Sequence, residues 1–231
     1  YKINNLDDLE AFRTRVNSGT TYEGLFVKLM ADIDGGSSWT PIGTSSNNFK
    51  GTFDGNNKTI TYVIPSTTTG YLGLFGYTYN ATIKYLNVDA TITQTGGNGN
   101  IGGIVAWQEG GTITNCTATG NITAATGSYA GGIVGRNGDY SHNSLSNTIS
   151  SCTSSVNITS SKTGGNYIGG IIGQIYAPGS VTGCSASGDI YAPEGSGTYI
   201  GGIAGYTSSS KTVSISGCGF TGNVRGAGYV G

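Results

Sequence analysis

Charged residues are scarce in this sequence: Asp, Glu, Lys and Arg make up 10% of its 231 residues, against about 25% in an ordinary soluble domain. The two signs nearly cancel, with a net charge of −1, so electrostatics gives no reason to expect nucleic acid or an anionic membrane surface as a partner. No apolar stretch approaches the roughly 18 residues of a membrane-spanning helix. We therefore expect no nucleic-acid partner and no direct insertion into a membrane.

The composition also lacks the Ala, Glu, Lys and Leu bias of a coiled coil or a long-helix protein. Hydrophobic residues reach 36% and there are 15 tyrosines, which is too apolar and too aromatic for a disordered tail. Glycine is abundant instead, with 42 residues. These properties leave one or two compact domains, or one elongated array.

One short phrase recurs five times along the chain, each time with a glycine before a pair of hydrophobic residues. These glycines are Gly73, Gly103, Gly132, Gly170 and Gly202. Their spacings are 30, 29, 38 and 32 residues. A fixed period of this length is typical of solenoids and other repeat folds.

A second phrase follows each copy of the first, and in the last four copies it contains a cysteine. Each repeat reads as three short strands, because Thr, Ser, Asn and Gly alternate with hydrophobic residues and no helical period is present. The repeat therefore predicts an all-β fold, a right-handed parallel β-helix (β-solenoid) with one three-strand coil of about 30 residues per repeat. Stacked coils bury the apolar inner face that a single coil would expose.

Residues 1–70 differ from the rest, and we interpret them as an N-terminal cap followed by the first irregular coils. A helix is expected over residues 5–17, because Leu6, Leu9, Phe12 and Val16 form one apolar stripe. Such a helix can cover the open end of a solenoid, where apolar core and strand edges would otherwise be exposed.

Residues 71–231 contain about five complete repeats, in one continuous domain with the cap. Tyr229-Val230-Gly231 matches Tyr199-Ile200-Gly201, so a sixth repeat has begun where the sequence stops. An uncapped coil would leave apolar ladders and strand edges exposed. We expect the repeats to continue into further repeats or domains of a longer protein.

The four cysteines, Cys116, Cys152, Cys184 and Cys218, share one position of the repeat, so they should form one inward column. A column cannot surround a tetrahedral zinc ion, and in-register stacking spaces Cβ atoms more widely than the roughly 3.8 Å of a disulfide. Free buried thiols are the first interpretation, with disulfides between neighbouring pairs as the alternative. An acidic calcium loop at residues 32–36 lacks the later ligands, so no metal and no cofactor are expected.

Length changes between repeats fall mainly at one corner, after the first strand of each coil. Insertions along one edge of a solenoid are often its working face, although solvated loops that merely tolerate insertions are the alternative. Aromatic side chains at this corner suit a sugar or a partner pocket. The candidate binding residues are Trp107, Glu109, Arg136, Tyr140, His142, Tyr176 and Tyr206.

The sequence resembles a known family. Gly-Leu-Phe-Gly at 73–76 and its variants, preceded by Trp-Thr-Pro-Ile-Gly at 39–43 and Phe-Asp-Gly-Asn-Asn-Lys-Thr-Ile at 53–60, resemble the GLUG-motif repeat proteins of bacterial surfaces. The resemblance covers nearly the whole chain and departs from the pattern at Ala106. It implies a β-helix in an exported, adhesin-like protein or in the non-catalytic part of an exported peptidase. It supplies no catalytic residue.

Two classes of function follow. The first is a non-catalytic, adhesin-like or structural module, extracellular or on a bacterial cell surface, which displays or binds a glycan or protein through one edge. The alternative is a carbohydrate-active lyase or hydrolase, which needs paired carboxylates; Glu109 and Asp139 fall at the same corner of adjacent coils. Ice binding is a minor alternative, because the outward column mixes threonines with Ser185 and Gly219.

Overall fold

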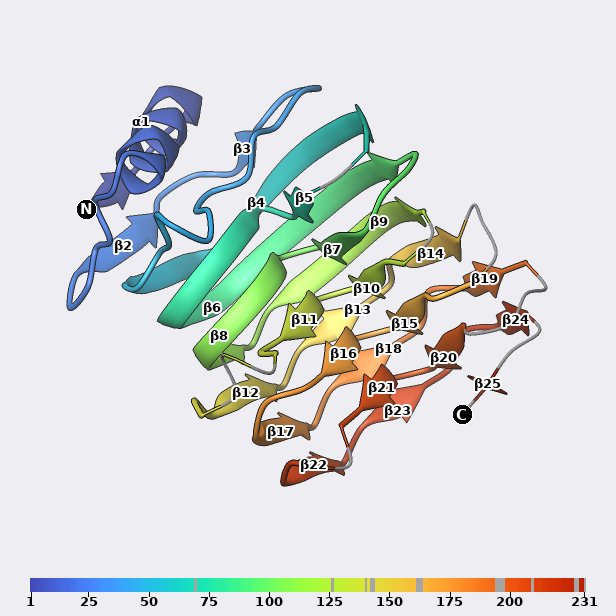
Figure 1. Ribbon diagram of the computed structural model, residues 1–231. Helices are drawn as coiled ribbons and strands as arrows, with labels where there is room; N and C mark the ends of the chain where they lie inside the picture. The colour runs from blue at the N-terminus through green and yellow to red at the C-terminus, as the bar shows by residue number, and fades with distance from the viewer. Residues whose placement is uncertain are drawn as a thin grey trace.

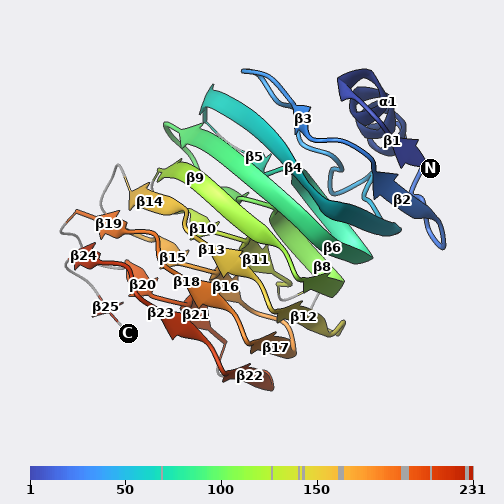
Figure 2. The ribbon, with the colours of Figure 1, turned by 180° about the vertical axis from the view of Figure 1, so that it is seen from behind.

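The computed structural model describes residues 1–68, 70–125, 127–139, 141, 144–160, 164–193, 198–208 and 210–226, and the backbone of 229–230. In these residues the chain winds as a parallel β-solenoid of about seven turns. The single helix in the described residues lies at the N-terminal end and the C terminus at the opposite end (Figure 1). Viewed from behind, successive coils stack side by side along the molecule (Figure 2). The predicted all-β solenoid is confirmed.

The first strand of each coil belongs to a six-stranded parallel sheet. Its strands are β5 (Gly70–Leu72), β7 (Gly99–Gly102), β10 (Tyr129–Gly131), β15 (Tyr167–Gly169), β20 (Tyr199–Gly201) and β25 (Tyr229–Val230). After this strand the chain bends sharply at the repeated glycine and enters the larger, 19-stranded sheet. The strands that follow the bend are β6 (Phe75–Gln94), β8 (Val105–Thr114), β11 (Val134–Asn137), β16 (Ile172–Ile175) and β21 (Ala204–Thr207).

The remaining strands of the repeats also belong to the larger sheet and pair in parallel from coil to coil. They are β9 (Thr117–Ala124), β12 (Asn147–Ser150), β13 (Thr153–Ser154), β14 (Asn157–Ser160), β17 (Gly179–Thr182), β18 (Ser185–Ala186), β19 (Ile190–Ala192), β22 (Val213–Ser216), β23 (Gly219–Phe220) and β24 (Val224–Gly226). The three-strand coil predicted from the sequence is therefore too simple. A later coil has five short strands, because the glycine bend divides the predicted first strand and a break at the cysteine divides the predicted second strand.

Like residues stack on like residues in the core. Ile113 pairs with Ile149 and Ile149 with Val181, and all three are at most 2% exposed. The predicted cysteine column is present: Cys116, Cys152 and Cys184 are buried and Cys218 is half-buried. Each thiol lies against backbone carbonyl oxygens, as Cys116 does with Thr114 at 3.2 Å. The cysteines thus fill the core as small hydrophobic residues, in the place that Leu86 takes in the first repeat.

The predicted helix is present as α1 (Leu6–Asn17), with Asn5 as the N-cap residue that accepts the Asp8 backbone N–H. Its stripe of Leu9, Phe12 and Val16 is fully buried. The Phe12 ring meets the rings of Phe49 and Phe53 at centroid distances of 5.5 and 5.9 Å. Within the described residues, no helix is long and apolar enough to cross a membrane.

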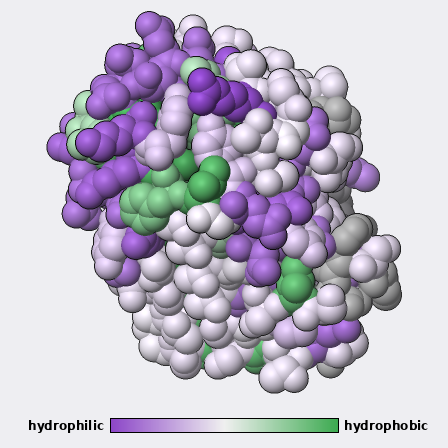
Figure 3. All heavy atoms as spheres, turned by 90° about the vertical axis from the view of Figure 1, so that its left-hand side faces the viewer, coloured by the Kyte–Doolittle hydropathy of each residue, from purple (hydrophilic) through white to green (hydrophobic). Residues whose placement is uncertain are grey.

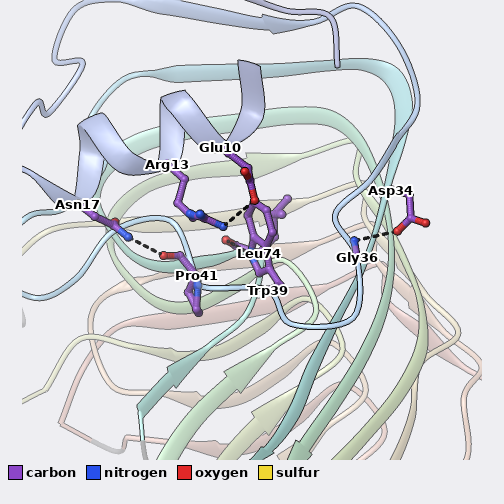
Figure 4. A network of polar contacts seen from close by, with 8 residues as sticks. All are labelled: Glu10, Arg13, Asn17, Asp34, Gly36, Trp39, Pro41 and Leu74. Atoms are coloured by element: carbon purple, nitrogen blue, oxygen red, sulfur yellow. Dashed lines mark hydrogen bonds and ion pairs between the residues drawn. The ribbon is translucent and has the colours of Figure 1, made fainter. Parts of the chain in front are cut away.

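Four strands complete the N-terminal part, β1 (Lys2–Ile3), β2 (Phe26–Leu29), β3 (Ile33–Asp34) and β4 (Thr52–Thr67). Polar contacts fix the helix to the loops of this part (Figure 4). Asn17 donates to the Pro41 carbonyl and accepts the Gly43 N–H, at 3.1 and 2.7 Å. The Arg13 guanidinium lies over the Trp39 ring, whose N–H donates to the Leu74 carbonyl. The helix is thereby attached directly to the first coils.

On the cap side, hydrophilic residues gather in the upper left of Figure 3, most of the remaining surface is of intermediate hydropathy, and hydrophobic residues form a patch left of the centre and a smaller one at the right. Leu25, Phe26 and Met30 are exposed by 57%, 46% and 38%. Lys84 places its ammonium group 5.5 Å from the Phe26 ring centroid. These single exposed side chains are normal for a soluble surface.

At the other end, the last coil is much less buried than the coil before it. Val181 and Cys184 are buried, whereas their counterparts Ile215 and Cys218 are exposed and half-buried. An open hollow of about 450 Å³ lies here, lined by residues that include Ile215, Phe220 and Val224. The apolar core of the described solenoid therefore reaches the surface at this end.

We expect backbone amides of residues 210–226 to exchange with solvent faster than the corresponding amides of 111–124, because local opening costs least where few apolar contacts are buried. Hydrogen exchange followed by mass spectrometry measures this on the chain in a monomeric preparation. Equal or slower exchange in 210–226 would show that the last coil is as stable as the inner ones.

Candidate functional site

An outward column of polar and aromatic side chains runs along the six-stranded sheet. The register places Tyr71, Asn100, Tyr129, Tyr167 and Tyr199 one above the other. They point outward because the next residue along each of these strands is a buried Leu, Ile or Ala. The last three rings stack almost in parallel, with centroids 5.1 Å apart.

These stacked tyrosines are half-buried. Their 5.1 Å centroid separation exceeds the roughly 3.5 Å contact distance of carbon atoms, as in an offset stack. Each ring therefore leans over its neighbour and leaves part of its face uncovered, in agreement with the half-buried state of Tyr129, Tyr167 and Tyr199. Burial raises the pKa of the Tyr167 hydroxyl, so this group stays protonated and able to donate at neutral pH.

A second column lies beside the first, on the strands that follow the glycine bend. It consists of Tyr77, Trp107, Arg136, Gln174 and Tyr206. We call the two columns together the aromatic face. The two columns are in contact in several coils. The Tyr71 ring contacts the Trp107 ring edge-on, with centroids 5.8 Å apart. The Tyr206 ring contacts Tyr167 and Tyr199 in the same way, at centroid distances of 5.4 and 5.6 Å.

Arg136 lies at the middle of the aromatic face and is enclosed by rings. Its guanidinium carbon is 4.8 Å from the Trp107 ring centroid, 4.6 Å from Tyr129 and 5.7 Å from Tyr176. Such cation–π contacts hold a guanidinium plane in place while its edge can still donate hydrogen bonds. The face thus has a fixed cation at its centre.

A carboxylate lies beside the N-terminal end of this face. The Tyr77 hydroxyl donates a hydrogen bond to Glu109, which is 6% exposed. Burial raises the pKa of Tyr77 well above its ordinary value, and the Glu109 and Asp139 charges raise it further. Of the two carboxylates paired in the sequence analysis, Glu109 is therefore engaged in a hydrogen bond with this hydroxyl.

Several buried polar atoms of the aromatic face lack a hydrogen-bond partner among the described residues. They are Asn100 Oδ1, Trp107 Nε1, Arg136 Nε and Gln174 Oε1. A buried polar atom without a partner costs about 1–3 kcal/mol, and native proteins contain few of them. Asn48, Gln108 and Thr198 contribute three more such atoms, so four of the seven in the described residues belong to this face.

The structure brings some of the residues of the sequence-based site together. Trp107, Arg136 and Tyr206 lie on the aromatic face, with Glu109 and Tyr176 next to it. They were assigned to a corner, but residues 107–111 lie inside β8, because the strand continues past the expected turn. Trp107 and Tyr176 are also 6% and 8% exposed, so they are packed side chains. Tyr140 and His142 lie outside the described residues.

Seven members of the aromatic face were missed: Tyr71, Tyr77, Asn100, Tyr129, Tyr167, Gln174 and Tyr199. A signal for them exists, because Tyr129, Tyr167 and Tyr199 each come three residues before the repeated glycine. The residue seven positions further on is Arg136, Gln174 or Tyr206, the member of the second column in the same coil.

Other candidates from the sequence have structural roles. Asp32 accepts the Thr59 N–H and Asp34 the Gly36 N–H, both at 2.8 Å. In the part of the chain that the structure describes, no group of three or more His, Cys, Asp and Glu residues could hold a metal. The outward column of Thr117, Thr153, Ser185 and Gly219 is mixed, as the sequence indicated.

The fold and the face together define a parallel β-solenoid repeat protein with outward aromatic ladders. Residues 97–123 and 164–191 match the family model described as the GLUG motif. Each match covers most of one coil, β7 to β9 in the first case and β15 to β19 in the second. The resemblance seen in the sequence is thereby confirmed: the chain carries GLUG-motif repeats on a β-solenoid.

Among solved structures, the chain is similar to the crystal structure of a putative immunoglobulin A1 protease from Bacteroides ovatus. The TM-score is 0.72 at 22% sequence identity, over 98% of this chain and 67% of that chain. At this identity the similarity shows a shared fold. A search of the curated proteins found no match.

Proposed function

We propose that this solenoid is a non-catalytic binding module of an adhesin-like protein, extracellular or on a bacterial cell surface, and that it binds its partner through the aromatic face. The observation that carries the proposal is the continuous column of half-buried side chains through five successive coils, from Tyr71 to Tyr199. Surface aromatic side chains of soluble proteins are usually scattered, and contiguous sets mark interaction sites.

Stacking alone explains only part of this face. Cross-strand ring pairs stabilise a sheet, and the Tyr129–Tyr167–Tyr199 stack does so here. A purely structural ladder, however, needs no guanidinium at its centre, and Arg136 lies there against the rings of Trp107 and Tyr129. Polar groups set among aromatic rings are typical of ligand sites.

Replacing Tyr167 by serine tests the binding role, because its ring contacts Tyr129, Tyr199 and Tyr206 at the centre of the ladder. We expect binding to an array of plant, fungal and bacterial polysaccharides and mucosal glycoproteins to weaken at least tenfold, as for a central aromatic anchor. The matched control is Tyr191→Ser, since Tyr191 is 49% exposed on β19, away from the face. Equal binding by the two variants, or no binding by the wild-type chain, would refute the proposal.

A carbohydrate-active enzyme is the second candidate, since Glu109 and Asp139 both act on the Tyr77 hydroxyl. We expect the purified chain to release no reducing ends and no unsaturated sugars from the same polysaccharides, because Glu109 is buried and already hydrogen-bonded. Depolymerisation that disappears in Glu109→Gln, with thermal stability unchanged, would replace the binding proposal by the enzymatic one.

A further inference from the structure

We infer that the aromatic face binds a neutral, linear polysaccharide laid parallel to the solenoid axis, with one sugar ring per coil. This inference rests on the binding function proposed above and adds the class and the direction of the ligand.

The shape of the face sets the direction. Across the axis it is two residues wide, for example Tyr129 beside Arg136. Along the axis it repeats in every coil from Tyr71 to Tyr199. A ligand that uses the whole face must therefore be long and narrow and must lie along the stack of coils.

The spacing of the face selects among long, narrow polymers. The stacked rings repeat every 5.1 Å. In an extended peptide, side chains on the same side are about 6.6 Å apart. This spacing is longer than that of the rings, so peptide side chains and rings lose their alignment within a few coils. In an extended chain of equatorially linked pyranoses, each sugar advances by close to the height of one coil. The repeat of the face therefore matches a polysaccharide.

The side chains of the face also suit sugars. A pyranose has an apolar C–H face and a rim of hydroxyl groups. The partly uncovered rings of Tyr129, Tyr167 and Tyr199 offer surfaces for the first. The hydroxyl groups of the same half-buried tyrosines can donate to and accept from the second.

Charge excludes the polyanionic alternatives. The charged groups on and beside the described part of the face are one cation, Arg136, and two acids, Glu109 and Asp139. A nucleic acid or a polyuronate carries a negative charge on each unit and needs a row of cations. At the C-terminal end of the face, the contacts among Tyr167, Tyr199 and Tyr206 join uncharged rings. A neutral chain fits both parts.

Calorimetric titration with oligosaccharides of two to six sugars tests the inference. The probes are neutral β-1,4-linked gluco-, manno-, xylo- and N-acetylglucosamine series, with malto-oligosaccharides and oligogalacturonides as helical and charged comparisons. We expect the affinity for at least one neutral series to rise severalfold with each added sugar and to level off at five or six, since five coils carry the face. Added salt should leave this affinity unchanged, because no ion pairs form.

The variants separate this inference from the proposed function. Tyr167→Ser should flatten the length dependence, and Tyr191→Ser should keep it. Affinity that does not depend on length, or that favours oligogalacturonides or malto-oligosaccharides, overturns the inference. If Tyr167→Ser instead loses binding only to a glycoprotein or a branched glycan, the inference fails while the binding face stands. If Tyr167→Ser binds the neutral series as the wild type does, the binding face itself is refuted.

Discussion

Replacing Gly170 by alanine should lower the free energy of unfolding by about 3 kcal/mol or more, the upper range for overpacking a closed site. A Cβ at this position would overlap the carbonyl oxygen of Gly202 and lie 2.7 Å from the Ala186 Cβ. The Gly202 carbonyl accepts the Gly170 N–H at 3.2 Å, and Ala186 is buried on β18, so neither neighbour can move freely. The glycine bend is therefore a point where two coils are in backbone contact.

Denaturant unfolding of the Gly170→Ala and Gly96→Ala variants measures this effect. Gly96 is the matched control, since a Cβ there meets no atom within 4 Å, and alanine at an open position is neutral or slightly stabilising. A loss below about 1 kcal/mol for Gly170→Ala, in the range of ordinary substitutions, would show that neighbouring coils are not packed at the bend as described.

Thiol reactivity should differ greatly along the cysteine column. The hydrogen bond with Cys116 is the largest cause that raises the pKa of Cys152, to about 12 from an ordinary 9.0. The Cys152 contact and burial raise the pKa of Cys184 as well. At a given pH below both values, a thiol with a pKa of about 12 has roughly a thousandfold less reactive thiolate than a thiol with a pKa of 9.0. Cys218, half-buried in the last coil, should react first.

Ellman's reagent at mildly alkaline pH should therefore label one thiol quickly and three slowly in the native protein, and all four after unfolding in guanidinium. The Cys218→Ser variant should lose the fast phase. Rapid labelling of three or four native thiols would contradict the buried column, and fewer than four after unfolding would indicate a disulfide.

The stacking of the coils could be predicted well from the sequence, because the spacing of the repeats determines which residues of neighbouring coils pair. Cysteines 36, 32 and 34 residues apart must fall in one column if each repeat is one coil, and they do. The helix was predictable for a similar reason, since Leu9, Phe12 and Val16 form a stripe that depends only on helical geometry.

The aromatic face was harder to predict from the sequence. Variable insertions drew attention to corners, yet Trp107 and Arg136 lie on strands. Their importance depends on side chains from neighbouring columns, such as Tyr129, which the glycine bend brings beside Arg136. The angle of that bend follows from backbone packing between coils, which a single repeat does not reveal.

Hydroxyl-radical footprinting, with the protein saturated by the neutral hexasaccharide that it binds most tightly, tests the central claim most directly. The aromatic face predicts lower modification of Tyr129, Tyr167 and Tyr199 in the complex, because their partly uncovered rings would be covered by sugar. Tyr85 and Tyr191, exposed by 42% and 49% elsewhere, should be modified as in the free protein. Protection of Tyr85 or Tyr191, with the three ladder tyrosines unchanged, would contradict the account.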